Sequence, residues 1–140
     1  MARDLPQLLH GYFAEHPDLG IVSVYLYGSH AEGRSHRESD VDVGVLLDWD
    51  EHPDEKERFD LRVRLTAEVM HALSENRIDL VVLNDVSPEL GRKVIRDGTR
   101  VFCADEETDQ AYVRDVQLRA ADLVPWLERM RKRKLEALRR

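Results

Sequence analysis

The sequence predicts an α+β fold, a small mixed β-sheet flanked by helices, on three observations. The 140 residues suffice for one domain, because domains usually hold about 100–150 residues. Segments with the apolar spacing of a helix alternate with short runs of β-branched residues that are typical of strands. Hydrophobic residues form 42% of the chain and charged residues 35%, which supports one buried core and excludes a disordered chain.

The first half of the chain is expected to form helix, strand, loop, strand and helix in that order. An amphipathic helix is expected from Leu5, before a buried strand at residues 21–27 (IVSVYLY). A polar loop follows at 28–39, and residues 40–47 start with the strict alternation of a strand. Residues 54–75 have helical spacing. The buried stripe of this helix is expected to contain Phe59, Val63, Ala67, Met70 and Leu73, flanked by Leu61, Leu65 and Val69.

The second half is expected to add two strands and two helices. Residues 78–83 form the third predicted strand. Ser87 can cap a short helix that begins with a proline and ends at Gly98. Residues 99–103 are expected to form an edge strand, and Asp105 can cap the final helix.

The final helix is too long for the domain to cover. At about 1.5 Å per residue it would measure about 50 Å, so residues 105–140 are expected to be a helical extension of a domain formed by 1–104. Pro125 has no backbone N–H and clashes with the preceding turn, so a break is expected at residues 122–124.

The end of this helix combines apolar and basic residues. The apolar residues are Trp126, Leu127, Met130, Leu135 and Leu138, and Arg129, Arg131, Lys132, Arg133 and Lys134 lie among them. Exposed apolar strips mark partner surfaces, so we expect residues 126–140 to dock a partner protein. The alternatives are a solvated helix end whose charges complement the helix dipole, or a segment that folds back as a core helix.

Charge and cysteine content exclude several classes. A net charge of −7 argues against direct nucleic-acid binding, which depends on basic residues that neutralise phosphates. Cys103 is the only cysteine, which excludes an internal disulfide and a cysteine-rich metal site. No secretory leader and no apolar run of about 20 residues is present, so a cytoplasmic protein without a membrane segment is expected.

Three acidic residues on two predicted strands are the candidate catalytic centre. Because side chains alternate across a strand, Asp40 and Asp42 should face one side of the sheet and Val41 the other. Without a cation two neighbouring carboxylates repel each other, and oxygen ligands suit magnesium. Asp79 is a third acid inside an apolar strand, where a charge is costly unless it is paired or bound to metal. It fits a third ligand that also acts as general base toward a hydroxyl.

Gly28 and Ser29 end the strand before this acidic pair and could form a cradle for phosphates.

Competing patterns are weaker. Residues 28–35 nearly match a P-loop, but they lack its lysine and lead into a strand instead of a helix. His30 and His36 have no cysteine or third histidine nearby, which makes a zinc site improbable. An isolated pair of Asp residues on a strand is usually a solvated face.

The chain resembles the DNA polymerase β nucleotidyltransferase superfamily. The residues that carry the resemblance are Gly28-Ser29, Ala31, Gly33, Ser39-Asp40-Val41-Asp42 and Asp79. The small size and residues 87–102 (SPELGRKVIRDGTRVF) resemble more narrowly the minimal nucleotidyltransferase (MNT) antitoxins encoded beside HEPN-domain toxins. Glu32 departs from the pattern, since these proteins often carry a basic residue there, and Arg34 or Arg37 could substitute for it.

The resemblance implies a nucleotidyltransferase fold and a function. It implies transfer of AMP from ATP, with two Mg²⁺ ions, to a tyrosine of a partner HEPN RNase toxin in a hetero-oligomer. The implied metal-binding and catalytic residues are Asp40, Asp42 and Asp79, and the implied nucleotide-binding residues are Gly28, Ser29, Ser39 and Arg34. Two alternatives remain: an antitoxin that only covers its toxin, and modification of a small molecule, for which no residues remain to build a substrate-binding domain.

Overall fold

The computed structural model describes residues 4–28 and 40–138. In chain order the elements are α1 (Leu5–Ala14), η1 (Pro17–Leu19), β1 (Ile21–Tyr27), β2 (Val41–Leu47), α2 (Glu55–Leu73), β3 (Ile78–Val82), η2 (Leu83–Asp85), α3 (Pro88–Asp97), β4 (Thr99–Cys103) and α4 (Glu106–Leu138), where η marks a short 3-10 helix. The predicted order of helices and strands is confirmed.

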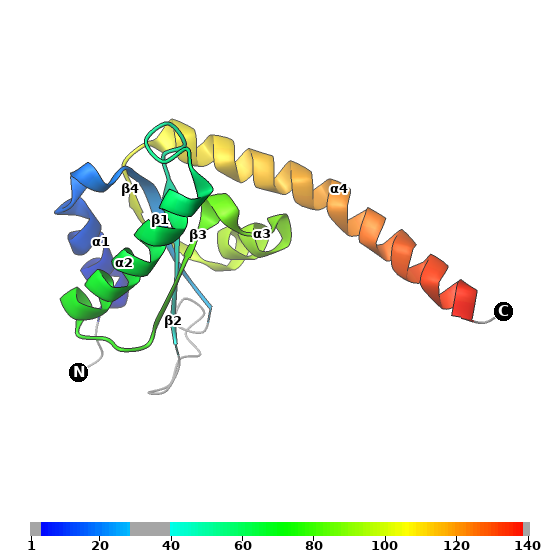
Figure 1. Ribbon diagram of the computed structural model, residues 1–140, viewed down its shortest axis with the longest axis horizontal. Helices are drawn as coiled ribbons and strands as arrows, with labels where there is room; N and C mark the ends of the chain where they lie inside the picture. Colours follow the sequence, from blue (N-terminus) through cyan, green and yellow to red (C-terminus); the bar gives the residue numbers. More distant parts are fainter. Residues whose placement is uncertain (1–3, 29–39, 139–140) are drawn as a thin grey trace.

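The four strands form one mixed sheet in the order β3-β2-β1-β4. β1 pairs antiparallel with both β2 and β4. β2 and β3 are parallel, and α2 is the crossover that parallel neighbours require. Helices lie on both sides of the sheet, with α1 and α2 to one side and α3 with the start of α4 to the other (Figure 1). The mixed sheet flanked by helices that the sequence predicts is therefore confirmed.

Strand alternation divides the core into two layers. Val41, Val43 and Val45 of β2 belong to the larger cluster, which also contains the buried side chains of α1 and α2. Leu46 belongs to a smaller cluster on the opposite face, with Tyr27 of β1 among its members. Because side chains alternate along a strand, the acidic residues that alternate with these valines lie on the second face.

The buried stripe of α2 differs from the expected one. Phe59 and Val63 are 58% and 56% exposed, and Ala67 is exposed as well. The buried residues are Arg58, Leu61, Leu65, Val69 and Leu73, so the expected flank faces the sheet. Arg58 lies on this same face and fits the observed rotation, since Nη2 lies 2.8 Å from Oδ1 of Asp85 in η2 and Nη1 donates to the main-chain oxygen of His52.

The first half of α4 is anchored to the sheet by a buried carboxylate. Asp109 is 2% exposed and accepts hydrogen bonds from Ser23 Oγ at 2.6 Å and Tyr25 OH at 2.7 Å, both on β1. Arg100 of β4 completes the site with Nη1 at 2.9 Å from Oδ2 of Asp109. Burial, the hydrogen bond to Asp109 and the charge of this carboxylate raise the pKa of Tyr25 above its usual value.

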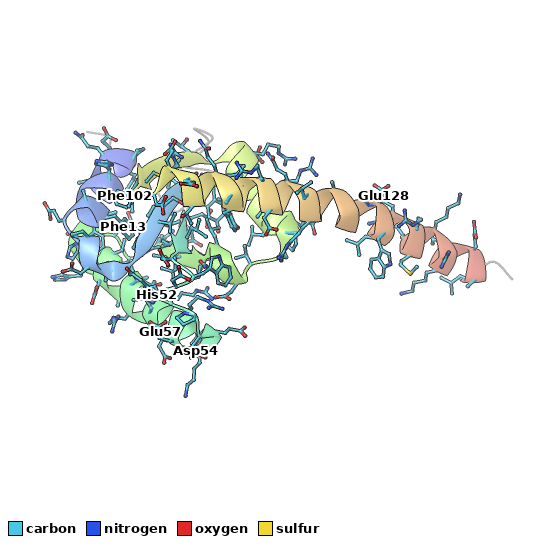
Figure 2. The ribbon with its side chains drawn as sticks, turned by 90° about the horizontal axis from the view of Figure 1, so that it is seen from above. Phe13, His52, Asp54, Glu57, Phe102 and Glu128 are labelled. Atoms are coloured by element: carbon cyan, nitrogen blue, oxygen red, sulfur yellow. The ribbon has the colours of Figure 1, made fainter. Side chains whose placement is uncertain are left out.

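The second half of α4 projects away from the domain (Figures 1 and 2). α4 continues through Pro125 without interruption, so the expected break at residues 122–124 is absent. One missing N–H bond does not end a long helix whose neighbouring turns remain hydrogen-bonded.

The segment does not fold back as a core helix, because its large apolar side chains stay exposed. They are Trp126 (48%), Leu127 (44%), Leu135 (53%) and Leu138 (75%). Across the described chain, α4 included, no helix has both the length and the apolar character needed to cross a membrane.

Candidate active site

Three neighbouring strands bring Tyr27, Asp42 and Asp79 side by side. Tyr27 pairs with Asp42 across β1 and β2, and Asp42 pairs with Asp79 across β2 and β3. Neighbouring strands lie about 4.8 Å apart, and directly paired residues point to the same face. Asp42 is half-buried and Asp79 is exposed, so both carboxylates occupy one face with a solvent-accessible side. The site lies at the end of the sheet where β1 ends and β2 begins (Figure 1).

Gly28 makes room for the Asp42 carboxylate. The glycine follows β1 directly and has φ +76°, a conformation that side chains rarely adopt. A Cβ added there would overlap Oδ2 of Asp42. The main chain at the turn therefore lies directly against the carboxylate, an approach that only glycine permits.

The Tyr27 hydroxyl lies near both carboxylates. Burial of this hydroxyl and the negative charges of Asp42 and Asp79 raise its pKa from 10.0 to about 12, against an opposing effect of Arg62. The phenol is therefore harder to ionise than a free tyrosine because of its burial and the two negative charges. A cation bound to the two carboxylates would neutralise this charge.

The donor set fits a hard divalent cation. Asp42 and Asp79 offer oxygen ligands from adjacent strands, and Mg²⁺ is commonly held by one or two carboxylates together with phosphates and water. Asp40 is exposed just before β2, two residues from Asp42. Within residues 4–28 and 40–138, no three His, Cys, Asp or Glu side chains gather into a preformed metal site. The structure thus pairs Asp42 with Asp79, whereas the expected cluster of all three acids, Asp40 included, is not assembled in the described part of the chain.

The remaining predicted nucleotide-binding residues, Ser29, Arg34 and Ser39, lie outside the described residues. The roles of these three residues stay predictions, and His30 and His36, for which the sequence argues against a zinc site, lie there too. Sequence reasoning missed Tyr27 and Arg62. Tyr27 carries a weak signal, since it comes directly before Gly28 at the end of a strand. Arg62 carries none, because its position depends on how α2 packs on β3.

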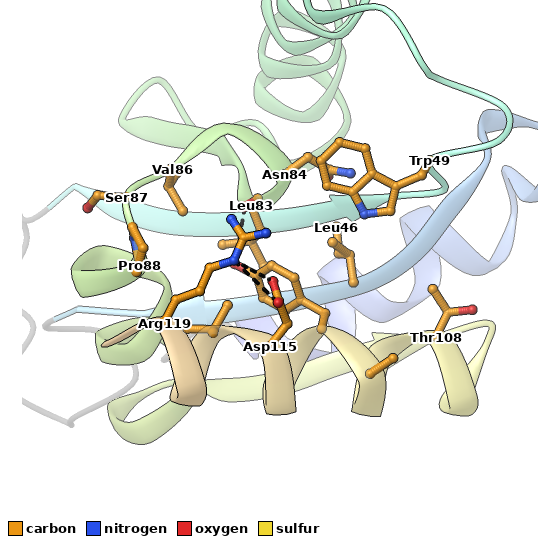
Figure 3. A pocket seen from close by; sticks show the side chains of 13 residues that line it. Leu46, Trp49, Leu83, Asn84, Val86, Ser87, Pro88, Thr108, Asp115 and Arg119 are labelled. Carbon is orange, nitrogen blue, oxygen red and sulfur yellow. Dashed lines mark hydrogen bonds and ion pairs between the residues drawn. The ribbon is translucent and has the colours of Figure 1, made fainter. Parts of the chain in front are cut away.

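A separate hollow of 280 Å³ lies at the other end of the same face, between α4 and η2 (Figure 3). Leu46, Trp49 and Tyr112 contribute to its wall. Its acidic residue, Asp115, is paired with Arg119 at 3.1 Å. This hollow contains none of the candidate catalytic acids.

A mixed sheet that presents carboxylates from adjacent strands beside a glycine turn defines an enzyme of phosphoryl or nucleotidyl transfer. Comparison with known proteins gives the family. The sequence model of the protein family described as "Polymerase beta, Nucleotidyltransferase" matches residues 8–107 of this chain. The chain belongs to the polymerase β nucleotidyltransferase family.

Similar proteins include antitoxins. The protein adenylyltransferase MntA of Shewanella oneidensis is 26% identical over 95 residues, which are 68% of this chain and 63% of that protein. The chain thus matches slightly less than two thirds of the length of this relative. A solved toxin–antitoxin structure with AMP-PNP has a TM-score of 0.64 at 22% identity and covers 92% of this chain and 96% of its own.

A second solved structure contains a tri-AMPylated Shewanella oneidensis HEPN toxin in complex with an MNT antitoxin. It matches with a TM-score of 0.61 at 19% identity, over 97% of this chain and all of the matched chain. At these identities both structural likenesses show a shared fold.

Proposed function

We propose that this protein is an antitoxin that transfers AMP from ATP to a tyrosine of a partner HEPN toxin and thereby silences it. The observation that carries the proposal is the pairing of Asp42 with Asp79 beside Gly28. The relative named protein adenylyltransferase and the complex with an AMPylated HEPN toxin support the acceptor class.

Each residue of the site has a role in this reaction. Asp40 and Asp42 would hold a cation at the triphosphate, and Asp79 would help hold a second one and accept the proton of the attacking hydroxyl. Two bound Mg²⁺ ions would supply charge stabilisation for the pyrophosphate and lower the pKa of the acceptor hydroxyl. Gly28 lets the main chain approach the site, and we assign Ser29, Ser39 and Arg34 to the phosphates.

The domain and the extension have separate tasks in this proposal. Residues 1–104 form the nucleotidyltransferase domain and 105–140 form the helical extension. The projecting part of α4 exposes apolar side chains among basic ones, which suits a protein partner. The complex is a hetero-oligomer in the cytoplasm, without direct contact to nucleic acid.

The same projecting helix favours a second candidate, an antitoxin that neutralises its toxin by covering it without chemistry. One experiment separates the two. The purified protein is incubated with the HEPN protein encoded beside it, ATP and Mg²⁺, and the intact mass of the partner is measured. Catalysis predicts a mass increase by whole AMP groups, abolished by EDTA. An unchanged mass together with inhibition of the RNase would contradict catalysis and support covering.

A further inference from the structure

A groove runs along the free edge of β3 and opens beside Asp79. β3 is the edge strand of the sheet. A hollow of 360 Å³ lies between α2 and β3, with Phe59, Arg62 and Val63 on one wall and Asp79 on the other. A smaller hollow of 130 Å³ adjoins it along the same edge toward η2 and shares Phe59 and Arg62. The groove therefore borders Asp79, a candidate catalytic acid at the exposed edge of the sheet.

The α2 wall of the groove is apolar and exposed. Phe59 and Val63 lie one helical turn apart and are 58% and 56% exposed, so they present one apolar strip to solvent. These are two of the residues that the sequence places in the core. A large aromatic side chain left exposed beside a catalytic acid is suited to anchor a partner segment.

Arg62 determines how a segment can bind there. Its Nε donates to the main-chain oxygen of Leu80 at 2.8 Å, which occupies a polar group of the open edge and disfavours addition of another strand. An incoming segment is therefore held by side chains. No hydrogen bond from the other guanidinium nitrogens is found among residues 4–28 and 40–138.

We propose that this groove binds the segment of the partner protein that carries the acceptor hydroxyl, with an apolar side chain against Phe59 and Val63. The proposal rests on the proposed function, in which the hydroxyl must reach Asp79. The hydroxyl oxygen forms a bond to the α-phosphorus of ATP, the bond from that phosphorus to the bridging oxygen breaks, pyrophosphate leaves, and Asp79 takes the proton. The projecting part of α4 lies away from this edge (Figure 1), so the groove selects the hydroxyl that is modified.

The test is the double variant Phe59→Ser/Val63→Ser. Both side chains are more than half exposed, so the melting temperature should stay at the wild-type value. We expect KM for the partner to rise at least about tenfold, as for loss of an interface anchor, with KM for ATP unchanged. Leu118→Ser is the matched control, since this α4 residue is 69% exposed and lies outside the groove; its kinetics should equal those of the wild type. A partner KM within twofold of wild type in the double variant would overturn the groove.

A second measurement separates this proposal from the proposed function. Val63 is replaced by the photo-cross-linker benzoylphenylalanine, with the same replacement of Leu118 as control. A cross-link from position 63 to the partner supports the groove, and its absence overturns it, whether or not AMP is transferred. A wild-type protein that transfers no AMP would contradict the proposed function alone.

Discussion

The position of the Asp42 carboxylate requires a residue without a side chain at position 28. A methyl group at position 28 would overlap Oδ2 of Asp42, and φ there is +76°. We expect Gly28→Ala to lower the free energy of unfolding by about 1–2 kcal/mol, the cost of a left-handed conformation in a non-glycine residue. AMP transfer should fall as well, because the carboxylate must move.

Gly11→Ala is the matched control for this substitution. Gly11 lies inside α1 and an added Cβ meets nothing within 4 Å, so alanine should stabilise the protein by about 0.5–1 kcal/mol. Urea unfolding of both variants measures the difference. Equal stability of Gly28→Ala and wild type would contradict the close approach.

Asp79 should separate binding from chemistry. The Asp79→Asn variant keeps its volume and its place on the exposed side of β3. We expect ATP and Mg²⁺ binding to be largely retained while transfer is lost, since a base acts on the acceptor and not on the triphosphate. Calorimetric titration with ATP and a single-turnover assay test this. A variant that binds no nucleotide would make Asp79 a structural ligand instead.

The candidate acids could be predicted from sequence because the strand period fixes which side chains share a face. Asp42 alternates with buried valines, and Asp79 alternates with Ile78 and Leu80. The presence of Tyr27 and Arg62 near the candidate acids could not be predicted from the sequence. It depends on the register between three strands and on the rotation of α2, which no local pattern determines.

At the scale of elements, α4 is held by its buried carboxylate. Removing Asp109 leaves the Ser23 and Tyr25 hydroxyls without their acceptor and takes away one of the two carboxylates that Arg100 contacts. We expect Asp109→Ala to cost about 3 kcal/mol, as for a broken buried network. Asp115→Ala, which removes an exposed partner of Arg119, should cost less than about 1 kcal/mol. Thermal unfolding compares the two, and equal losses would contradict the anchoring role.

The two helices that differ from expectation differ for separate physical reasons. Two stripes of α2 fit the helical period, and the one that faces the sheet also contains Arg58, which pairs with Asp85. This pair joins residues 27 positions apart, which periodicity cannot detect. In α4 the local effect of Pro125 is real, but a helix that projects into solvent has no partner that would force the chain to turn.

At the scale of the whole molecule, α4 divides into an anchored half and a projecting half (Figure 1). Truncation after Val124 removes only the projecting half, whose apolar side chains are exposed. We expect nearly unchanged thermal stability and ATP affinity, and weaker association with the toxin by at least about tenfold, or about 1.4 kcal/mol. Biolayer interferometry measures the association. Unaltered affinity in a folded truncation would show that this half is a solvated helix end.

The element order and the mixed sheet followed from the sequence because strand and helix signals alternate cleanly along it. The boundaries of the first strand, Ile21–Tyr27, agree with the predicted ones because a β-branched run lies between two glycines. The projection of α4 also followed from its length. Which face of each helix packs against the sheet could be determined only from the structure.

The central claim is that Asp42 forms part of a cation-binding site for nucleotidyl transfer. Asp42→Asn removes the charge and keeps the volume, so the fold should remain intact. The measurement is the single-turnover rate of AMP transfer to the HEPN partner at saturating Mg²⁺ and ATP, beside Asp18→Asn, an exposed carboxylate in η1, as the charge-matched control. We predict a rate at least about 100-fold below wild type for Asp42→Asn, since several kcal/mol of transition-state stabilisation are lost, and an unchanged rate for Asp18→Asn. A folded Asp42→Asn variant whose rate lies within about threefold of wild type, less than 1 kcal/mol, would contradict the account.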